Sequence, residues 1–222
     1  MFVYFLNDKS VNEKCHELHQ RFNQLPKLSF PLSLEQIPDN GIYILFEKGE
    51  HAHDTNRIVR VGTHTGENQL KPRIKQHFVR EKKDRSIFRK NIGRCILNKS
   101  NDPFLEHWDL DLTTRKAREK HASEIDFDKQ ANIEKQVSEY LRSRFSIAVF
   151  EVPEKEDRLH MESRITSTVS LCDDCKPSTS WLGLDSTKQK IRESGLWQVN
   201  ELYKTPFDSE ELKKIIRKFV ES

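Results

Sequence analysis

Three apolar runs along the chain predict β-strands. Gly41 to Glu47 is rich in β-branched and aromatic residues, which are typical of a strand. Arg57 to Gly62 alternates between basic and apolar residues, so we expect it to pair with the first strand across a polar loop over 48–56. Phe145 to Val152 predicts a third strand, which ends because Pro153 lacks a backbone donor. These runs predict a small antiparallel sheet of about three strands.

Apolar residues at intervals of three or four predict helices around these strands. The predicted helices lie at about 8–25, 70–80, 86–97, 113–121, 129–144 and 154–171, with a last amphipathic helix that contains Leu212, Ile215, Ile216 and Phe219. Asp8 is the expected cap of the first helix, and Asp208 or Ser209 that of the last. We therefore expect one α+β domain over 1–222, with a core at about 38–171, a helical insertion at about 81–143 and a C-terminal extension at about 177–222.

The positive charge of the chain is concentrated in one segment. The 222 residues are 33% charged and 35% hydrophobic, and their formal net charge is +3. Residues 70–99 hold 11 Lys and Arg against two acidic residues, Glu81 and Asp84. This segment favours a polyanion such as nucleic acid as the ligand. A solvated basic helix face would have the same composition, so charge alone does not decide between the two.

Hydropathy and cysteine usage restrict the remaining classes of protein. No segment is long and apolar enough to span a membrane, and the N-terminus lacks a signal-peptide pattern, so we expect a cytoplasmic protein with free thiols. Cys172 and Cys175 form a single CxxC pair, whereas a structural zinc site takes four ligands. His51 and His53 lie far away in the sequence. Zinc binding is therefore not the favoured interpretation of the CxxC pair.

Four side chains with complementary chemistry occur in order on the predicted elements. Tyr43 lies in the first strand, Arg73 and His77 are one turn apart on the following helix, and Glu162 lies on the helix after the third strand. Each alone has a structural explanation: a core aromatic, a surface arginine, a packed histidine and a salt-bridged glutamate. Together they favour a catalytic site.

The order of these residues resembles that of the GIY-YIG nuclease superfamily. Gly41-Ile42-Tyr43 matches the first half of the motif, and Arg60-Val61-Gly62 stands where Tyr-Ile-Gly is usual. The resemblance covers about 38–171, with the helical insertion inside it. It implies an endonuclease, related to restriction-like branches of the superfamily, that hydrolyses DNA phosphodiester bonds with Mg²⁺ or Mn²⁺.

The chemistry implied by the resemblance suits these side chains. Glu162 would bind the metal, because a carboxylate is the hard oxygen ligand that Mg²⁺ prefers. The planar fork of Arg73 suits phosphate oxygens. Tyr43 would deprotonate or orient the attacking water, and His77 would assist the proton transfer.

Two positions depart from the family pattern. Arg60 replaces a tyrosine and keeps its proton, so it cannot act as a base, although it can contact phosphate or stabilise a neighbouring tyrosinate. The asparagine that often follows the glutamate helix is absent, and Ser178 or Ser180 stands in its neighbourhood. The alternatives are a DNA-binding module of the same fold that no longer cleaves, or an interaction subunit of a repair or defence complex.

Further contacts to DNA are expected from basic residues near the site. His64, in the loop after the second strand, would reach the same cleft as a phosphate contact, although a loop histidine without such a role is slightly favoured. The other expected contacts are Lys71, Lys75, Arg80, Arg85, Arg89, Lys90 and Arg94. Phe88, Trp181 and Trp197 are expected to pack in the core. Cleavage of both strands would suit a homodimer, and the amphipathic C-terminal helix would suit a partner protein.

Overall fold

A four-stranded antiparallel sheet lies at the centre of the molecule. The computed structural model describes the backbone of residues 9–220 and the side chains of residues 9–216. The strands are β1 (Lys27–Ser29), β2 (Gly41–Ala52), β3 (Thr55–Gly62) and β4 (Phe145–Glu151), in the spatial order β1-β4-β2-β3. The predicted α+β fold with a small antiparallel sheet is confirmed. The short β1, which pairs with β4, is the strand that the sequence did not predict.

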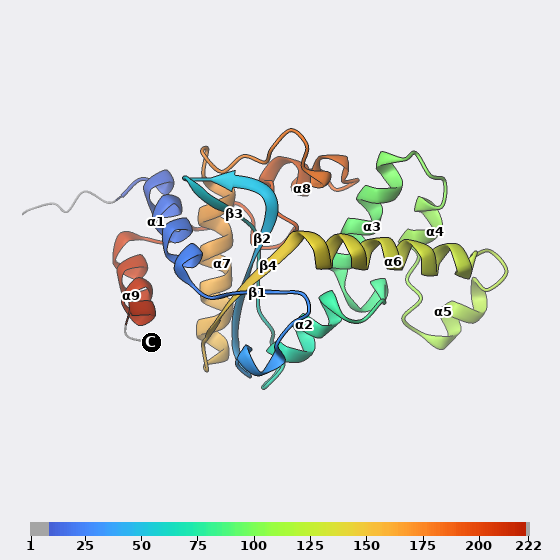
Figure 1. Ribbon diagram of the computed structural model, residues 1–222, viewed down its shortest axis with the longest axis horizontal. Coiled ribbons are helices and arrows are strands. Elements are labelled where there is room, and N and C mark those ends of the chain that lie inside the picture. The colour runs from blue at the N-terminus through green and yellow to red at the C-terminus, as the bar shows by residue number, and fades with distance from the viewer. Residues whose placement is uncertain (1–8, 221–222) are drawn as a thin grey trace, which may run out of the picture.

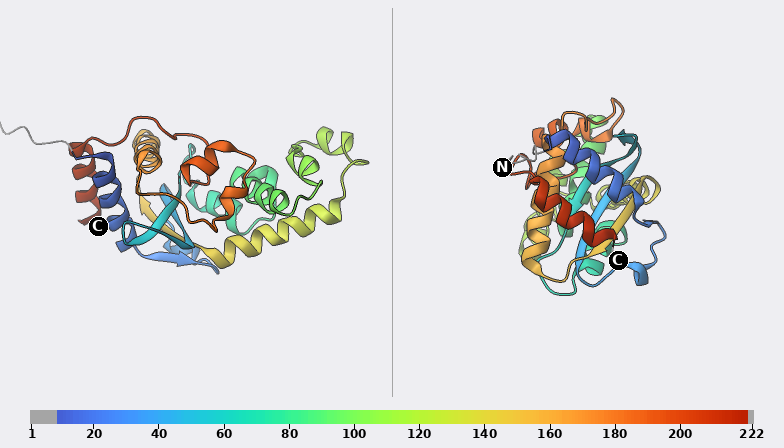
Figure 2. Two further views of the ribbon diagram at one scale, coloured as in Figure 1. Left: turned by 90° about the horizontal axis from the view of Figure 1, so that it is seen from above. Right: turned by 90° about the vertical axis from the view of Figure 1, so that its left-hand side faces the viewer.

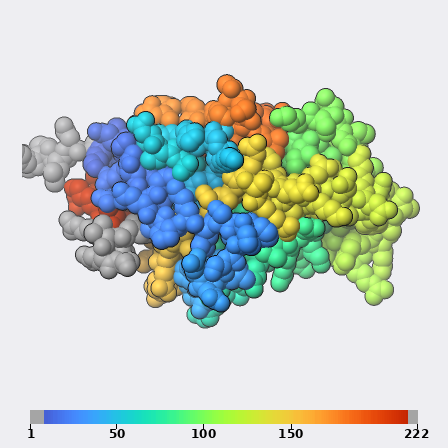
Figure 3. All heavy atoms as spheres, viewed as in Figure 1, coloured from blue at the N-terminus to red at the C-terminus, as the bar shows by residue number. Residues whose placement is uncertain are grey.

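Helices cover both faces of this sheet (Figure 1). They are α1 (Val11–Gln24), α2 (Leu70–Phe78), α3 (Ile87–Lys99), α4 (Leu105–Asp109), α5 (Arg115–Lys120), α6 (Phe127–Arg144), α7 (Lys155–Leu171), α8 (Gln189–Ser194) and α9 (Ser209–Val220), with short 3₁₀ turns at Leu34–Gln36, Lys83–Arg85 and Leu182–Asp185. Helices α1, α7 and α9 lie beyond one face of the sheet, and α6 extends away from the other with α3, α4 and α5 beside it (Figures 1 and 2). In the space-filling view, α6 separates the N-terminal third of the chain from α3 to α5 (Figure 3). Among the described residues, none of the helices has the length and apolar content needed to span a bilayer.

The two faces of β2 belong to two different hydrophobic cores. Tyr43 and Leu45 pack with residues of α2, α3 and α6, whereas Ile42 and Ile44 pack with residues of α1, α7 and α9. Successive side chains of a strand point to opposite faces, so a strand covered on both sides is apolar throughout. This arrangement explains the continuous apolar run that begins at Gly41.

The hairpin between β2 and β3 corrects the expected loop over 48–56. Strand β2 continues to Ala52 and β3 begins at Thr55, so only His53 and Asp54 form the turn. Both turn residues have positive φ, 52° and 58°, as the tight two-residue hairpins require. Residues 51–56 contain neither Asn-Gly nor Asp-Gly, the pairs that usually mark such a turn, so no local signal indicates it.

The register of β2 with β3 positions Arg60. Tyr43 lies opposite Gly62 and Leu45 opposite Arg60, so Arg60 lies on the same face of the sheet as Tyr43, with which it forms a hydrogen bond. The next residue, Phe46, lies opposite Ile58, so β3 carries a bulge at Val59 directly beside Arg60.

The first helix begins with a complete capping box. Ser10 accepts a hydrogen bond from the backbone of Glu13, and the Glu13 carboxylate accepts one from the backbone of Ser10. Asp8, the expected cap, lies outside the described residues. The capping box satisfies amides that the first turn leaves without a helical partner.

The last helix packs against the chain itself. Asp208 caps α9 by accepting a hydrogen bond from the backbone N–H of Glu211 at 2.7 Å, as predicted. Leu212, Ile215 and Ile216 are buried in the core that α1 and α7 share. The side chain of Phe219 lies outside the described ones. The expectation that this apolar face receives a partner protein is therefore wrong for the three described residues.

Candidate active site

Tyr43 and His77 form a buried hydrogen-bonded pair. Tyr43 Oη lies 2.9 Å from His77 Nε2, and His77 Nδ1 lies 2.7 Å from Ser86 Oγ. Ser86 is the N-cap of α3 and accepts a hydrogen bond from the backbone N–H of Arg89. The start of α3 thus fixes the imidazole that contacts the phenol. Sequence reasoning did not identify Ser86, although its position before an apolar-periodic segment is a capping signal.

His77 is a neutral imidazole in this environment. Burial holds its pKa well below the ordinary value of 6.5, and the cationic side chains of Arg60, Arg73 and Arg89 lower it further. A neutral ring has one donor and one acceptor nitrogen, which suits contacts to two hydroxyl groups. The neutral ring can therefore accept a hydrogen bond from the Tyr43 hydroxyl group at Nε2.

Arg60 connects the tyrosine with its surroundings. Its Nε donates to Tyr43 Oη at 3.3 Å, and its guanidinium also donates to the carbonyl oxygen of Trp197. The guanidinium carbon lies 5.0 Å from the centre of the Phe88 ring, a cation–π contact. Arg60 thus places a cation beside the hydroxyl group of Tyr43.

Gly62 is required by the position of Tyr43. The two residues face each other across β2 and β3. A Cβ atom on residue 62 would lie 2.2 Å from Tyr43 Oη, which no side chain tolerates. The last glycine of the second strand therefore makes room for the hydroxyl group.

One cavity brings together three of the predicted residues. A hollow of about 410 Å³ is lined by Arg60 from β3, Arg73 from α2 and Glu162 from α7. Tyr43 and His77 are almost fully buried and lie outside this lining, connected with it through the Arg60 hydrogen bond. The predicted residues thus form two layers, a charged cavity and a tyrosine–histidine pair next to it.

Glu162 is a partly shielded carboxylate with its own backbone donor. Burial raises its pKa above the ordinary value, and the nearby Glu201 carboxylate raises it further. Arg60, the backbone N–H of Thr63 and Arg73 act in the opposite direction. Two carboxylates close together in a shielded site repel each other, and a cation between them removes that repulsion.

Several cavity residues come from a segment that sequence reasoning did not connect with the site. Gln198, Asn200 and Glu201 line the cavity, as does Asn91 of α3. This segment runs along the edge strand β3, where Trp197 N–H donates to the Val59 carbonyl and Gln198 accepts from the Val61 N–H. Its position depends on long-range pairing, so no local signal indicated it.

Ser178 and Ser180, which lie near the expected position of the family's asparagine in the sequence, do not line the Glu162 cavity. Ser178 donates to the Glu50 carboxylate and is absent from the cavity lining, as is Ser180. Amide side chains of the segment just described occupy the cavity instead. Ser178 and Ser180, which occupy the expected neighbourhood along the sequence, are therefore not part of this cavity.

The donor set of the cavity fits a hard divalent cation. Glu162 offers carboxylate oxygens and Asn200 an amide oxygen, and Glu201 adds a carboxylate that is paired with Lys204 at 2.7 Å. The amide oxygens of Asn91 and Gln198 also face the site but accept hydrogen bonds from Arg94 and from the Val61 N–H. Mg²⁺ and Mn²⁺ prefer such oxygen ligands and retain several waters. The lining holds neither cysteine nor histidine, so its chemistry favours these ions over zinc.

His64 has the structural role that the sequence slightly favours for it. Its Nδ1 donates to the carbonyl oxygen of Gly66 at 2.6 Å, and its Nε2 accepts from the backbone N–H of Gly41 at 3.3 Å. Both ring nitrogens are therefore engaged with backbone groups. Burial lowers its pKa, which keeps the ring neutral. The expectation of a phosphate contact is replaced by that of a packed loop histidine.

Three of the basic residues expected on a DNA surface are buried and paired. Arg89 forms an ion pair with Glu134 at 2.7 Å and is 0% exposed. Lys90 donates to the carbonyl oxygen of Asp109, and Arg94 forms an ion pair with the Asp109 carboxylate. These partners lie far away in the sequence, which is why the prediction for Arg89, Lys90 and Arg94 is wrong.

The remaining predicted basic residues lie at or near the surface. Arg80 and Arg85 are exposed and line a hollow of about 540 Å³ beyond the end of α2. Lys75 is half-buried on α2, and Lys71 forms an ion pair with Asp39 at 2.9 Å. The exposed arginines thus continue from the helix that carries Arg73.

Comparison with known proteins identifies the family of the chain. A family model described as GIY-YIG domain matches residues 8–222. Neither the curated proteins nor the solved structures include a match to this sequence. Because the family model spans nearly the whole sequence, the chain belongs to the GIY-YIG domain family.

Proposed function

We propose that this protein is a divalent-metal-dependent DNA endonuclease that acts in the cavity of Glu162. Membership of the GIY-YIG family indicates a nuclease, and such nucleases generally depend on a divalent metal. The observation that carries the proposal is the convergence of Arg60, Arg73 and Glu162 on one cavity. Phosphodiester hydrolysis requires charge neutralisation at phosphorus together with an activated water, and these side chains serve those needs.

The two arginines and the glutamate divide the work of binding. Arg73, on α2, binds phosphate oxygens. In the free protein its guanidinium donates a hydrogen bond to Gln76 of the same helix. Glu162 and Glu201 hold the cation, which supplies charge stabilisation at phosphorus. Arg60 neutralises the developing charge from the floor of the same cavity.

Tyr43 and His77 move the proton. The phenol takes a proton from the attacking water and passes its own proton from Oη to His77 Nε2, 2.9 Å away. Arg60 stabilises the tyrosinate that forms in this exchange. Because Tyr43 is 1% exposed in the free protein, side chains around it must move before water reaches the phenol.

Plasmid cleavage tests this proposal. In Mg²⁺ or Mn²⁺, Glu162→Gln should cleave supercoiled DNA at least about 100-fold more slowly than the wild type, because it removes a charged ligand without changing the volume. Glu156→Gln, on an exposed residue of the same helix, is the matched control and should retain activity. Equal rates in Glu162→Gln and the wild type would refute the mechanism.

The products of the same assay test the expectation that the protein cleaves DNA as a homodimer. Paired active sites on the two strands should produce linear DNA early, whereas independent single sites should accumulate nicked circles first. Light scattering of the protein–DNA complex measures the number of chains bound. A linear product from a complex that contains a single chain would contradict the dimer.

A DNA-binding module that does not cleave is the second candidate. This candidate is favoured because Tyr43 is buried behind Arg60, and Arg60 stands where the family has its second tyrosine. Such a module would bind duplex DNA with a steep dependence on salt and leave it intact in every divalent metal. Cleavage that depends on Glu162 would exclude it.

A further inference from the structure

Three cysteines and two histidines meet on the side of the molecule opposite to the insertion. Cys15 lies on α1, His53 at the tip of the β2–β3 hairpin, and Cys172 and Cys175 follow the end of α7. Cys15 Sγ, Cys172 Sγ and a ring nitrogen of His53 all lie within 4.8 Å of one another. The same limit holds for Cys15, Cys175 and His19. Cys15 therefore lies between the two other thiols.

The two histidines of this cluster differ in whether a ring nitrogen is available to bind a metal. His19 is buried, and its Nδ1 lies 2.9 Å from the Cys15 carbonyl oxygen while its Nε2 accepts from the backbone N–H of Ile58 at 3.1 Å. His53 instead directs its Nε2 at Cys172 Sγ, 3.4 Å away. A ring with both nitrogens engaged is a poor ligand. His53 is therefore the better donor, and His19 holds the hairpin in place.

We propose that Cys15, Cys172, Cys175 and His53 bind one structural zinc ion. Three thiolates and one imidazole form a common structural zinc set, and soft sulfur ligands favour Zn²⁺ over Mg²⁺ or Mn²⁺. Zinc–sulfur bonds of about 2.3 Å and zinc–nitrogen bonds of about 2.0 Å place tetrahedral ligand atoms about 3.6–3.8 Å apart. The 3.4 Å between Cys172 Sγ and His53 Nε2 is close to such an edge.

The turn that carries the CxxC pair is built to hold its sulfurs. The backbone N–H of Asp174 donates to Cys172 Sγ. The backbone N–H of Asp173 donates to Asn12 Oδ1 of α1 at 3.1 Å, which fastens the turn to the helix that carries Cys15. Outer contacts of this kind orient metal ligands. His53 and Asp174 also line an open hollow, so an ion reaches the cluster from solvent.

The proposed ion corrects the interpretation of the CxxC pair from the sequence. The missing ligands come from Cys15, which is hidden in the apolar stripe of α1, and from His53, which the tight hairpin brings to the cluster. None of the four ligands lines the Glu162 cavity. The ion would therefore fasten α1, the hairpin and α7 together, and its binding does not depend on the nuclease proposal.

Metal content of the purified protein tests the site. Protein expressed with zinc and dialysed without chelator should contain close to one zinc per chain by inductively coupled plasma mass spectrometry. Cys172→Ser and Cys175→Ser should each lower this content by at least half, whereas Cys95→Ser, on α3 in the other core, should not. A wild type that contains no zinc and binds none when Zn²⁺ is added, or that carries a disulfide among these cysteines, would overturn the proposal.

A second measurement identifies the fourth ligand. His53→Ala should weaken zinc binding at least about tenfold in competition with a chelator, whereas His51→Ala, on an exposed residue near the end of β2, should not. X-ray absorption of the zinc-loaded wild type should show three sulfur ligands and one nitrogen ligand, a readout that needs no variant. Full affinity in His53→Ala would overturn the assignment of His53, and a shell of oxygen ligands would overturn the whole site.

Discussion

At the level of single residues, buried charged groups determine which faces of this protein are available for function. Glu47 is 3% exposed and accepts hydrogen bonds from Trp181 Nε1 at 2.9 Å and Trp197 Nε1 at 2.8 Å. Burial raises its pKa, and these hydrogen bonds partly offset the rise. Glu50 forms a 2.6 Å ion pair with the fully buried Arg57. These contacts confirm that the two tryptophans pack in the core, and they fix the segment that follows Trp197 beside the cavity.

The pH dependence of stability should report the buried His77. In the unfolded chain a histidine binds a proton as the pH falls below about 6.5, but the folded protein resists this because burial lowers the pKa of His77. The free energy of unfolding should therefore fall with decreasing pH, by about 1.4 kcal/mol per pH unit from this group. In His77→Gln that contribution should vanish.

Urea unfolding at pH 7.5 and 5.5 measures this difference. The stability gap between the wild type and His77→Gln should shrink at the lower pH. His51→Gln, on an exposed side chain, controls for the loss of an imidazole. Parallel pH curves for the wild type and His77→Gln would show that His77 titrates normally.

At the level of elements, the sequence predicted those whose signals are local. The strand that begins at Gly41 and the helices α6 and α7 follow from apolar runs and periodicity. Strand β1 has three residues, too few for a pattern, and exists because it pairs with β4. The turn at His53 and Asp54 has positive φ at both residues, but neither glycine nor asparagine marks it in the sequence.

Only those residues of the candidate site that belong to a sequence motif could be predicted. Tyr43, Arg73 and Glu162 were identified through their order along the chain, and the structure places Arg73 and Glu162 in one cavity with Arg60. The roles of Arg89 and Lys90 could not be predicted, because their partners come from residues 134 and 109. Sequence shows the charge of a side chain but not what neutralises it.

Helix α9 should contribute to stability through its apolar face. Leu212 is 1% exposed and packs in the core shared with α1 and α7. Leu212→Ala should lower the free energy of unfolding by about 2–4 kcal/mol, because it leaves a cavity. Leu184→Ala, on a 38% exposed residue, should cost less than about 1 kcal/mol. A similarly small loss in Leu212→Ala, measured by urea unfolding, would indicate a loosely docked helix.

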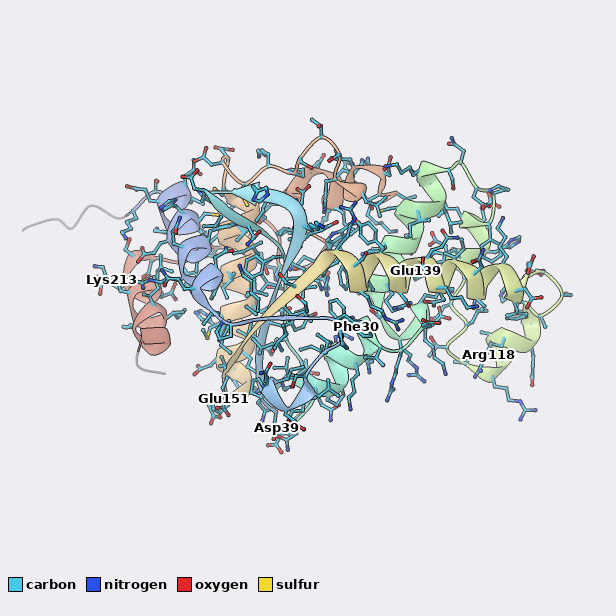
Figure 4. All side chains as sticks on the ribbon, viewed as in Figure 1. Phe30, Asp39, Arg118, Glu139, Glu151 and Lys213 are labelled. Atoms are coloured by element: carbon cyan, nitrogen blue, oxygen red, sulfur yellow. The ribbon has the colours of Figure 1, made fainter. Side chains whose placement is uncertain are left out.

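At the scale of the whole molecule, exposed positive charge lies in two places, beside the cavity and on the distant helix α5. Arg73 lines the cavity, and Arg80 and Arg85 line the hollow beyond the end of the same helix. Helix α5 lies at the far end of the molecule, where Figure 4 labels Arg118. DNA that reaches the Glu162 cavity should therefore cross the arginines after α2 and not those of α5.

The salt dependence of DNA binding tests this path. In the Glu162→Gln background, the double change Arg80→Ala/Arg85→Ala should reduce the slope of log K against log salt by about 1.8, because each phosphate contact contributes about 0.9. Lys116→Ala/Arg118→Ala removes the same charge from exposed residues of α5 and should leave the slope nearly unchanged. Equal effects of the two pairs would show that the duplex does not follow this path.

The most direct test of the central claim is anomalous diffraction from a crystal soaked in Mn²⁺. The account predicts a manganese peak in the cavity lined by Arg60, Arg73 and Glu162, within about 2.5 Å of a Glu162 carboxylate oxygen. A vacant Glu162 carboxylate in crystals of protein that cleaves DNA in the same Mn²⁺ buffer would contradict it.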